Sequence, residues 1–205
     1  MDSQELVATR QSLHGVAELL IAGPQHRAHG TIRLKATGDG FGGAVSPLRV
    51  AGSELVWEGG RAPLTGTYRE LAAAAGIDVG APVGVYSDTT GMDPDAALTV
   101  DPASAKVICA WFVLGDAGLH RFAPDLEPVL WPEHFDLGFT LDEVNYGISP
   151  GDGGHAGPYA YVGPWEAREG EFWNVSFGAL RTAGELTDAD AIVAFFTAGQ
   201  EAARR

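Results

Sequence analysis

Residues 134–151, HFDLGFTLDEVNYGISPG, contain the pattern that decides the fold, because apolar and polar residues alternate on both sides of Asp142-Glu143. Such alternation predicts two half-buried strands joined by a two-residue hairpin turn. The cross-strand pairs expected on the apolar face are Leu141 with Val144, Phe139 with Tyr146 and Leu137 with Ile148. Because side chains alternate between the faces of a sheet, we expect this face to pack against the core.

The opposite face of the predicted hairpin is polar and carries a pair of glycines, Gly138 and Gly147, at its centre. Glycines inside strands commonly mark a close approach by backbone or ligand, so a pocket on this face is one interpretation. The alternative is structural, with a helix end resting on the glycines and Asp136 as its cap. The candidate ligand-binding residues, from the hairpin and the loop after it, are His134, Asp136, Asn145, Ser149, Asp152 and His155.

His134 and Asp136 lie two apart on one predicted strand, where they can share a proton, a metal or a polar ligand. Asp152 and His155 belong to SPGDGGHAGP (149–158), whose glycines suit either a lid over the polar face or an exposed turn. His134, Asp136 and His155 are weak metal candidates, because no established histidine or cysteine spacing accompanies them. The sequence identifies no catalytic residue and no cofactor.

In the first half of the chain, apolar residues at helical spacing predict a helix over about residues 4–22 that stops at Gly23-Pro24. The segment GDGFGG (38–43) is typical of a turn between strands. Three strands are expected here, in TIRLKAT (31–37), AVSPLRV (44–50) and LVWEGG (55–60). A helix over 65–77 and a short strand over 81–88 follow them.

Capping residues locate the remaining helices. Thr67 or Thr65 can begin the helix that Gly76 ends, and Asp101 or Ser104 can begin a largely apolar helix that reaches Phe122. A closing helix follows a cap at Thr187 or Asp188.

The order helix, three strands, helix therefore occurs twice, over about residues 4–77 and 102–203. This order predicts an α+β fold of antiparallel strands packed with helices, and the recurrence suggests an internal pseudo-repeat. A chain of 205 residues suits a single globular domain, 1–205, with two α+β halves at about 1–100 and 101–205.

Acidic residues outnumber basic ones by 27 to 13, which gives a formal net charge of −14. This charge repels phosphate backbones and anionic membranes, so we expect neither nucleic acid nor membrane as a partner. A single cysteine, Cys109, excludes an intrachain disulfide and suits a reducing compartment. The first residues include Asp2 and Glu5 rather than a basic region, and together these features predict a soluble cytoplasmic protein.

Several short motifs carry a resemblance: WPEHFDLGF (131–139), YGISPGD (146–152), PYAYVGPW (158–165) and EFWN (171–174). They resemble an uncharacterised family of high-GC Gram-positive bacteria over most of the chain. The sequence is more distantly similar to a wider bacterial domain family of unknown function. The residues of this chain that correspond to motifs of the wider family are Leu13-His14, Phe135 to Gly138 and Pro150-Gly151. The resemblance implies a bacterial cytoplasmic protein and no particular reaction.

Two functions are open at this point. The first is a small-molecule-binding protein or an enzyme, with its pocket on the polar face of the hairpin. The second is a noncatalytic interaction module that forms homo-oligomers through exposed aromatic residues. The two hypotheses differ on Trp165 and Trp173, which would surround a concave polar cavity in the first case and form a flat apolar patch in the second.

Overall fold

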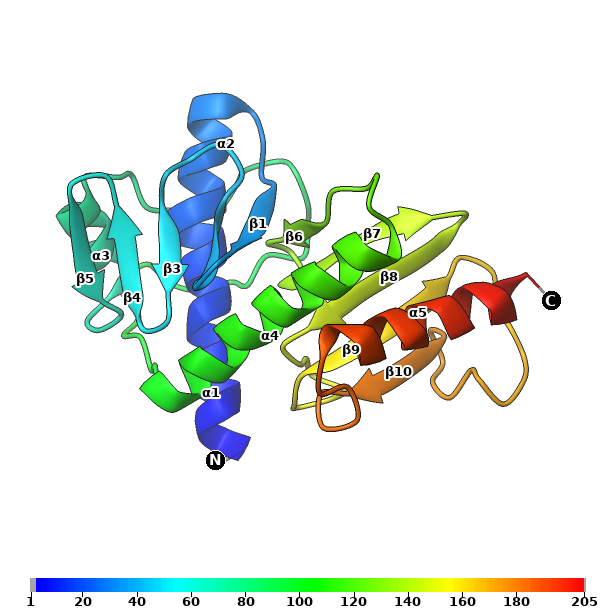
Figure 1. The fold of residues 1–205 in the computed structure, drawn as a ribbon. Coiled ribbons are helices and arrows are strands. Elements are labelled where there is room, and N and C mark those ends of the chain that lie inside the picture. The colour runs from blue at the N-terminus through cyan, green and yellow to red at the C-terminus, as the bar shows by residue number, and fades with distance from the viewer. Residues whose placement is uncertain (1–2, 205) are drawn as a thin grey trace.

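The computed structural model describes residues 3–204 and has an α+β fold, as predicted: a ten-stranded antiparallel sheet flanked by helices (Figure 1). The helices are α1 (Ser3–Gly15), η1 (Val16–Ala22), α2 (Gly23–His29), α3 (Tyr68–Ala75), α4 (Pro102–Phe122) and α5 (Ala189–Ala203). The strands of the first half are β1 (Leu34–Thr37), β2 (Gly40–Gly43), β3 (Arg49–Ala51), β4 (Glu54–Trp57) and β5 (Gly60–Pro63). Those of the second half are β6 (Val129–Trp131), β7 (Asp136–Leu141), β8 (Val144–Ser149), β9 (Tyr159–Pro164) and β10 (Ala179–Thr182).

The two halves of the chain form the two halves of the sheet, whose strand order is β10-β9-β8-β7-β6-β1-β2-β3-β4-β5. They join where Leu34 of β1 pairs with Leu130 of β6. Helix, strands and helix do recur, but each half has five strands rather than the three predicted. In the first half the two additional strands are β2 and β5. The first of them was not predicted because residues 38–43 were expected to form a turn. Only Gly38-Asp39 turn, and Phe41 of β2 is fully buried.

The predicted stop of the first helix at Gly23-Pro24 is also wrong. The α1, η1 and α2 segments continue one another as far as His29. In the π-helical η1 the hydrogen bonds reach one residue further, so that the Gly23 N–H donates to the Glu18 carbonyl. Pro24 then occupies the first turn of α2. Its lack of a backbone N–H costs no hydrogen bond there. Gly30, with φ of 71°, ends the helix.

The segment between α3 and α4, residues 76–101, contains no strand, so the strand predicted at 81–88 is wrong. Several of its hydrogen bonds go to the first helix instead. Glu18 of η1 is fully buried and accepts hydrogen bonds from the Tyr86 hydroxyl and the Thr90 N–H, each at 3.0 Å, and from the Thr90 hydroxyl. This one carboxylate therefore ties the long segment to η1.

The helix caps follow the predictions. Thr67 and Glu70 form a reciprocal capping box at the start of α3, and Gly76 ends this helix in the left-handed conformation. Asp101 caps α4 by accepting the Ser104 N–H. Asp188 caps α5 by accepting the N–H of Ala191.

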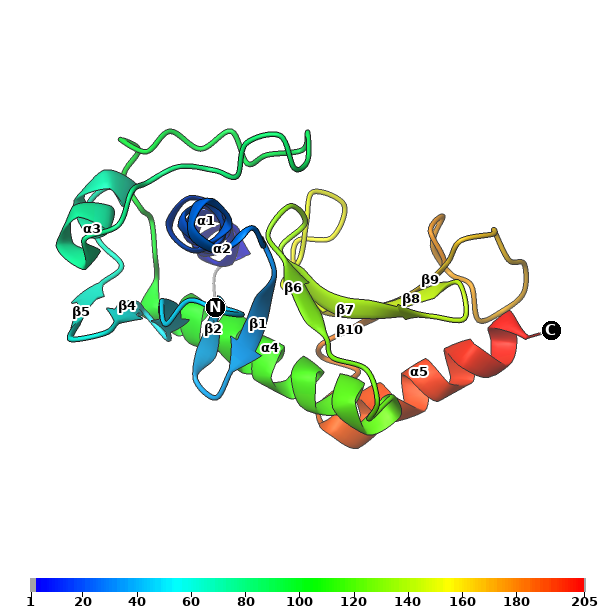
Figure 2. The same ribbon diagram turned by 90° about the horizontal axis from the view of Figure 1, so that it is seen from above.

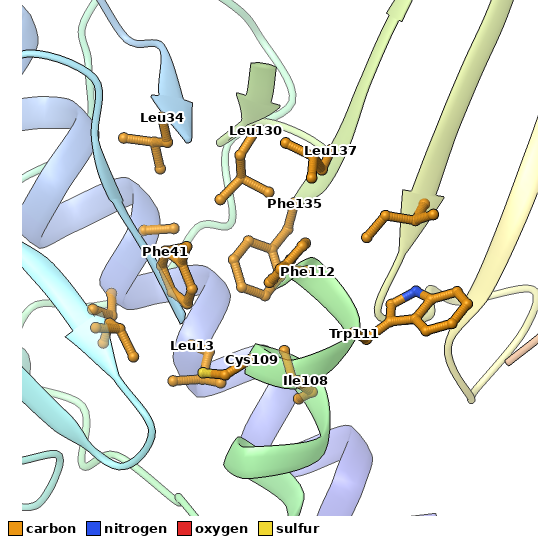
Figure 3. Close-up of a cluster of buried hydrophobic side chains, with 14 of the residues drawn as sticks. Leu13, Leu34, Phe41, Ile108, Cys109, Trp111, Phe112, Leu130, Phe135 and Leu137 are labelled. Atoms are coloured by element: carbon orange, nitrogen blue, oxygen red, sulfur yellow. The ribbon is translucent and has the colours of Figure 1, made fainter. Parts of the chain in front are cut away.

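Helix α4 holds the two halves together, because it packs against β1 and β2 as well as against β7 and β8. Seen from above, α1 and α3 lie on one side of the strands and α4 and α5 on the other (Figure 2). At the junction the rings of Phe41, Phe112 and Phe135 meet edge to face, with centroids 5.2–5.7 Å apart (Figure 3). Cys109 is buried near Leu13 and Ile108 (Figure 3). No helix within residues 3–204 is long and apolar enough to cross a membrane.

The β7-β8 hairpin has the predicted register, from Leu137 opposite Ile148 to Leu141 opposite Val144. Asp142 and Glu143 form the two-residue turn, with φ values of 52° and 62°. On the apolar face, the Tyr146 ring packs against Phe122 of α4 and Phe196 of α5, with centroids 4.8 and 5.7 Å away. This face therefore lies in the core, and the polar face points away from α4 and α5.

Candidate functional site

The polar side of the second half-sheet borders a cavity of about 730 Å³. Four of the six predicted candidates line it: His134, Asp136, Ser149 and Asp152. The remaining lining residues are Arg10, Gln11 and His14 from α1, Glu133 and Phe135 from the β6-β7 turn, Gly151 and Gly153 from the loop 150–158, and Tyr159, Tyr161 and Phe177. The cavity thus brings the first helix, the hairpin and the loop to one place.

Asp136 is the most unusual group on the cavity wall. Its Oδ2 accepts a hydrogen bond from the Tyr161 hydroxyl, whereas its buried Oδ1 has no hydrogen-bond partner within residues 3–204. Burial raises the pKa of Asp136, and the bond from Tyr161 opposes this only in part. Burial and the neighbouring carboxylate also raise the pKa of Tyr161 well above its ordinary value. Tyr161 therefore keeps its proton and acts as a donor.

Gly147 of the hairpin makes room for Tyr161. This residue lies on β9 opposite Gly147, and a Cβ atom added to Gly147 would be 2.5 Å from the tyrosine oxygen. A Cβ on Gly138 would be 2.4 Å from the backbone oxygen of Tyr146. No helix end rests on the glycines and Asp136 caps no described helix, so the structural alternative given above is wrong. At Gly147 the close approach comes from a side chain of the neighbouring strand, and at Gly138 it comes from the backbone of β8.

His14 reaches the cavity from α1. Its Nε2 donates to the carbonyl oxygen of Pro132 at 2.6 Å, and its ring stacks on Phe135 with centroids 5.2 Å apart. Burial lowers the pKa of His14, and the hydrogen bond to Pro132 opposes this shift only in part. The neutral ring is therefore favoured, with its proton on Nε2, and Nδ1 has no hydrogen-bond partner in the described part of the chain.

Arg10 and Asp152 hold the loop 150–158 in place. The guanidinium of Arg10 donates to the carbonyls of Ala156, at 2.9 Å, and Asp152, at 3.1 Å. The Asp152 carboxylate accepts the N–H groups of Gly154 and His155 and the Tyr159 hydroxyl, at 2.5–2.7 Å. The loop is thus a bonded turn over the cavity rather than a free lid.

The pKa values of these two anchors follow from the same contacts. Burial alone would raise the pKa of Asp152, but the hydrogen bonds from Tyr159 and from the loop backbone outweigh it and lower this pKa. Burial lowers the pKa of Arg10, while the charge of Asp152 opposes the shift. Asp152 is therefore ionised at neutral pH beside the guanidinium.

Asn145 and His155 lie outside the cavity. Asn145 accepts a hydrogen bond from Thr140 at 2.6 Å and borders a separate hollow of about 410 Å³. His155 packs its ring edge-on against Tyr159. His134 is exposed, with its Nε2 3.4 Å from a Glu133 carboxylate oxygen. No three His, Cys, Asp or Glu side chains within residues 3–204 are arranged to hold a metal ion.

The two tryptophans do not behave alike. Trp165 is 65% exposed and borders the 410 Å³ hollow together with Phe177, which is 47% exposed. Trp173 is partly buried and packs edge-on against Phe172, with centroids 4.9 Å apart. Neither residue lines the 730 Å³ cavity, and the two do not form one flat patch. The location of the tryptophans therefore does not decide between the two functions.

Sequence reasoning missed Arg10, His14, Tyr159 and Tyr161. A signal existed for the first two, because residues four apart in a helix share one face. The roles of the tyrosines depend on the register of β9, which no local pattern indicates. Comparisons of the chain with models of protein families, with curated proteins and with solved structures found no match.

Proposed function

We propose that the protein binds a small organic molecule in the 730 Å³ cavity, with Asp136 as its polar anchor. The observation that carries this proposal is the unpartnered Oδ1 of Asp136. The great majority of buried polar atoms in proteins have a hydrogen-bond partner. Asp136 lines the cavity, so a ligand that draws its carboxyl toward the cavity would supply the missing partner.

The size and lining of the cavity support the proposal. Ligand sites commonly occupy about 300–1,000 Å³ and combine apolar walls with a few well-placed polar groups. Phe135, Tyr159, Tyr161 and Phe177 supply aromatic surface, while Asp136 supplies one such polar group.

The position of the cavity gives further support. The wall is built from the first helix, which lies far away in the sequence, from the hairpin, and from the loop that follows the hairpin. Each contributes to the wall: His14 from the first, Asp136 from the second and Gly151 from the third. Residues that are brought together from separate elements at one concavity are typical of a binding site.

Small molecules that copurify with the protein test the proposal. We expect mass spectrometry of the extracted compounds to show one enriched with the wild type and depleted with Asp136→Asn, which can still accept the Tyr161 bond. Asp95→Asn, at a surface ion pair with Arg69, is the control and should retain the compound. The proposal fails if no compound is enriched and no member of a metabolite library raises the melting temperature of the wild type.

Self-association is a second candidate, and the exposure of Trp165 and Phe177 around one hollow favours it. Exposed aromatic residues at one place are a frequent feature of protein interfaces. Light scattering over a concentration series tests this function. It predicts a dimer at micromolar concentration that Trp165→Ser with Phe177→Ser converts to a monomer; a monomeric wild type at tens of micromolar contradicts it.

A further inference from the structure

We infer that the group of the ligand that meets Asp136 is a protonated amine. This inference rests on the proposed function, because it takes the 730 Å³ cavity as the ligand site and assigns the chemical class of the ligand. Its basis is the balance of charge on the cavity wall, the use that each cationic side chain already has, and the arrangement of the aromatic rings.

Carboxyl groups dominate the polar wall. Glu133, Asp136 and Asp152 all line the cavity, against one guanidinium, that of Arg10. Arg10 is only 8% exposed and already donates to the two loop carbonyls. Two of its five N–H groups are thus committed to the loop, which leaves less of this one cation for an anionic ligand, whereas a ligand cation meets three carboxyl groups.

The histidines do not reverse this balance. Burial lowers the pKa of His14, which favours its uncharged form, and its Nε2–H is engaged by Pro132. His134 is exposed, and its Nε2 lies beside the Glu133 carboxylate. The uncharged form of His14 thus offers no positive charge to an anion, and the Nε2 of His134 already has a carboxylate beside it.

The aromatic rings form a row beside Asp136. Tyr161 lies between Tyr159 and Phe177, with ring centroids 6.3 and 6.5 Å away. Aromatic faces attract cations through their quadrupole, and ring edges pack well against further rings. An amine attached to an aromatic or aliphatic body therefore has partners in this cavity for both of its parts.

Asp136 makes amine binding a proton-linked event. Burial favours its neutral form, whereas a bound ammonium group favours the carboxylate, so binding releases a proton from Oδ1. The titratable and charged groups that interact with Asp136 include Tyr161, His134, Glu133 and Tyr159. Affinity for an amine should accordingly rise with pH as long as the amine itself remains protonated.

Three probes of matched shape test the inference: benzylamine, benzyl alcohol and benzoate, titrated calorimetrically into the wild-type protein at neutral pH and low salt. We expect benzylamine to bind at least about tenfold more tightly than benzyl alcohol, and benzoate to bind most weakly. In Asp136→Asn the advantage of benzylamine over benzyl alcohol should fall to within about threefold. Asp190→Asn, whose side chain is 88% exposed at a surface ion pair with Arg121, is the control and should leave all three affinities unchanged.

A second variant guards against misfolding of Asp136→Asn. Glu133→Gln changes a side chain that is 27% exposed at the edge of the cavity, and it should reduce the benzylamine preference by a smaller factor. Equal or tighter binding of benzoate, an undiminished preference in Asp136→Asn, or no binding of benzylamine would overturn the inference. Copurification of a neutral or anionic compound that depends on Asp136 would overturn the inference while the proposed function stands.

Discussion

Glu18 and Asp136 are carboxyl groups with buried oxygen atoms in the two halves of the molecule, and they are bonded in opposite ways. Glu18 accepts hydrogen bonds on both oxygens, from Tyr86 and from Thr90. Asp136 accepts one bond from Tyr161 and leaves Oδ1 without a partner within residues 3–204. A buried carboxyl with hydrogen bonds on both oxygens thus holds the fold together, whereas one with an unpartnered oxygen at a cavity-lining residue is a candidate ligand anchor.

The largest effect should come from the saturated carboxyl. Glu18→Ala leaves the Tyr86 and Thr90 donors without an acceptor, and we expect the free energy of unfolding to fall by about 3 kcal/mol. Glu5→Ala, at an exposed position of the same long helix, is the matched control. Urea denaturation measures both. A loss below about 1 kcal/mol in Glu18→Ala would remove the contrast between the two carboxyls.

Gly147→Ala tests how the glycine supports the Asp136 site. Its Cβ would lie 2.5 Å from the Tyr161 oxygen, so the tyrosine must move away from Asp136. We expect the free energy of unfolding to fall by about 2 kcal/mol through overpacking, together with weaker ligand binding. Gly163→Ala is the control, because its Cβ would have only ordinary contacts, the nearest at 3.4 Å. Equal stabilities of the two variants would contradict this role of Gly147.

Arg10→Met tests the connection between the cavity and its loop. The substitution keeps the aliphatic stem but removes the hydrogen bonds to Ala156 and Asp152, so we expect a loss of about 1.5 kcal/mol. Hydrogen exchange should accelerate in the loop 150–158 and remain unchanged in α3. Unaltered exchange in the loop would show that Arg10 does not hold it.

The smallest effect concerns pH. Burial raises the pKa of Asp136 in the folded state, so its protonated form stabilises the fold at low pH, and this contribution is lost as pH rises through the raised pKa. The amide of the Asp136→Asn variant is neutral at every pH and loses no such contribution. The stability of this variant relative to the wild type should therefore improve as pH rises from below the ordinary pKa of an aspartate toward neutrality. Urea midpoints at several pH values measure the difference, and a difference independent of pH would contradict the shift.

Local patterns were sufficient wherever the stabilising contacts are local. The register of the β7-β8 hairpin follows from alternation and from a turn of two residues, and the caps at Thr67 and Asp188 involve only the next helical turn. The segment 81–88 was assigned wrongly because Tyr86 donates its hydroxyl hydrogen bond to Glu18 in a distant helix, and no described strand pairs with this segment. Residues 38–43 were assigned wrongly because burial of Phe41 overrides the turn tendency of the glycines around it.

The candidate site shows the same division. His134, Asp136, Ser149 and Asp152 were found because they lie on one hairpin or in the loop that follows it. Tyr161 could not be assigned to the site, because its bond to Asp136 requires β9 to lie beside β8 in one register. Arg10 and His14 likewise arrive through packing of the first helix, which no pattern within the hairpin indicates.

The position of α4 has a consequence for the order of events during synthesis. The chain reaches α4 only after the whole first half-sheet has been made, yet the Phe41 ring of that half packs against Phe112 and Phe135. In a nascent chain that ends before α4, the Phe41 side chain of β2 thus lacks both of these partners. The two halves are alike in the order of their elements, but the core of the first half is complete only after the second half has been synthesised.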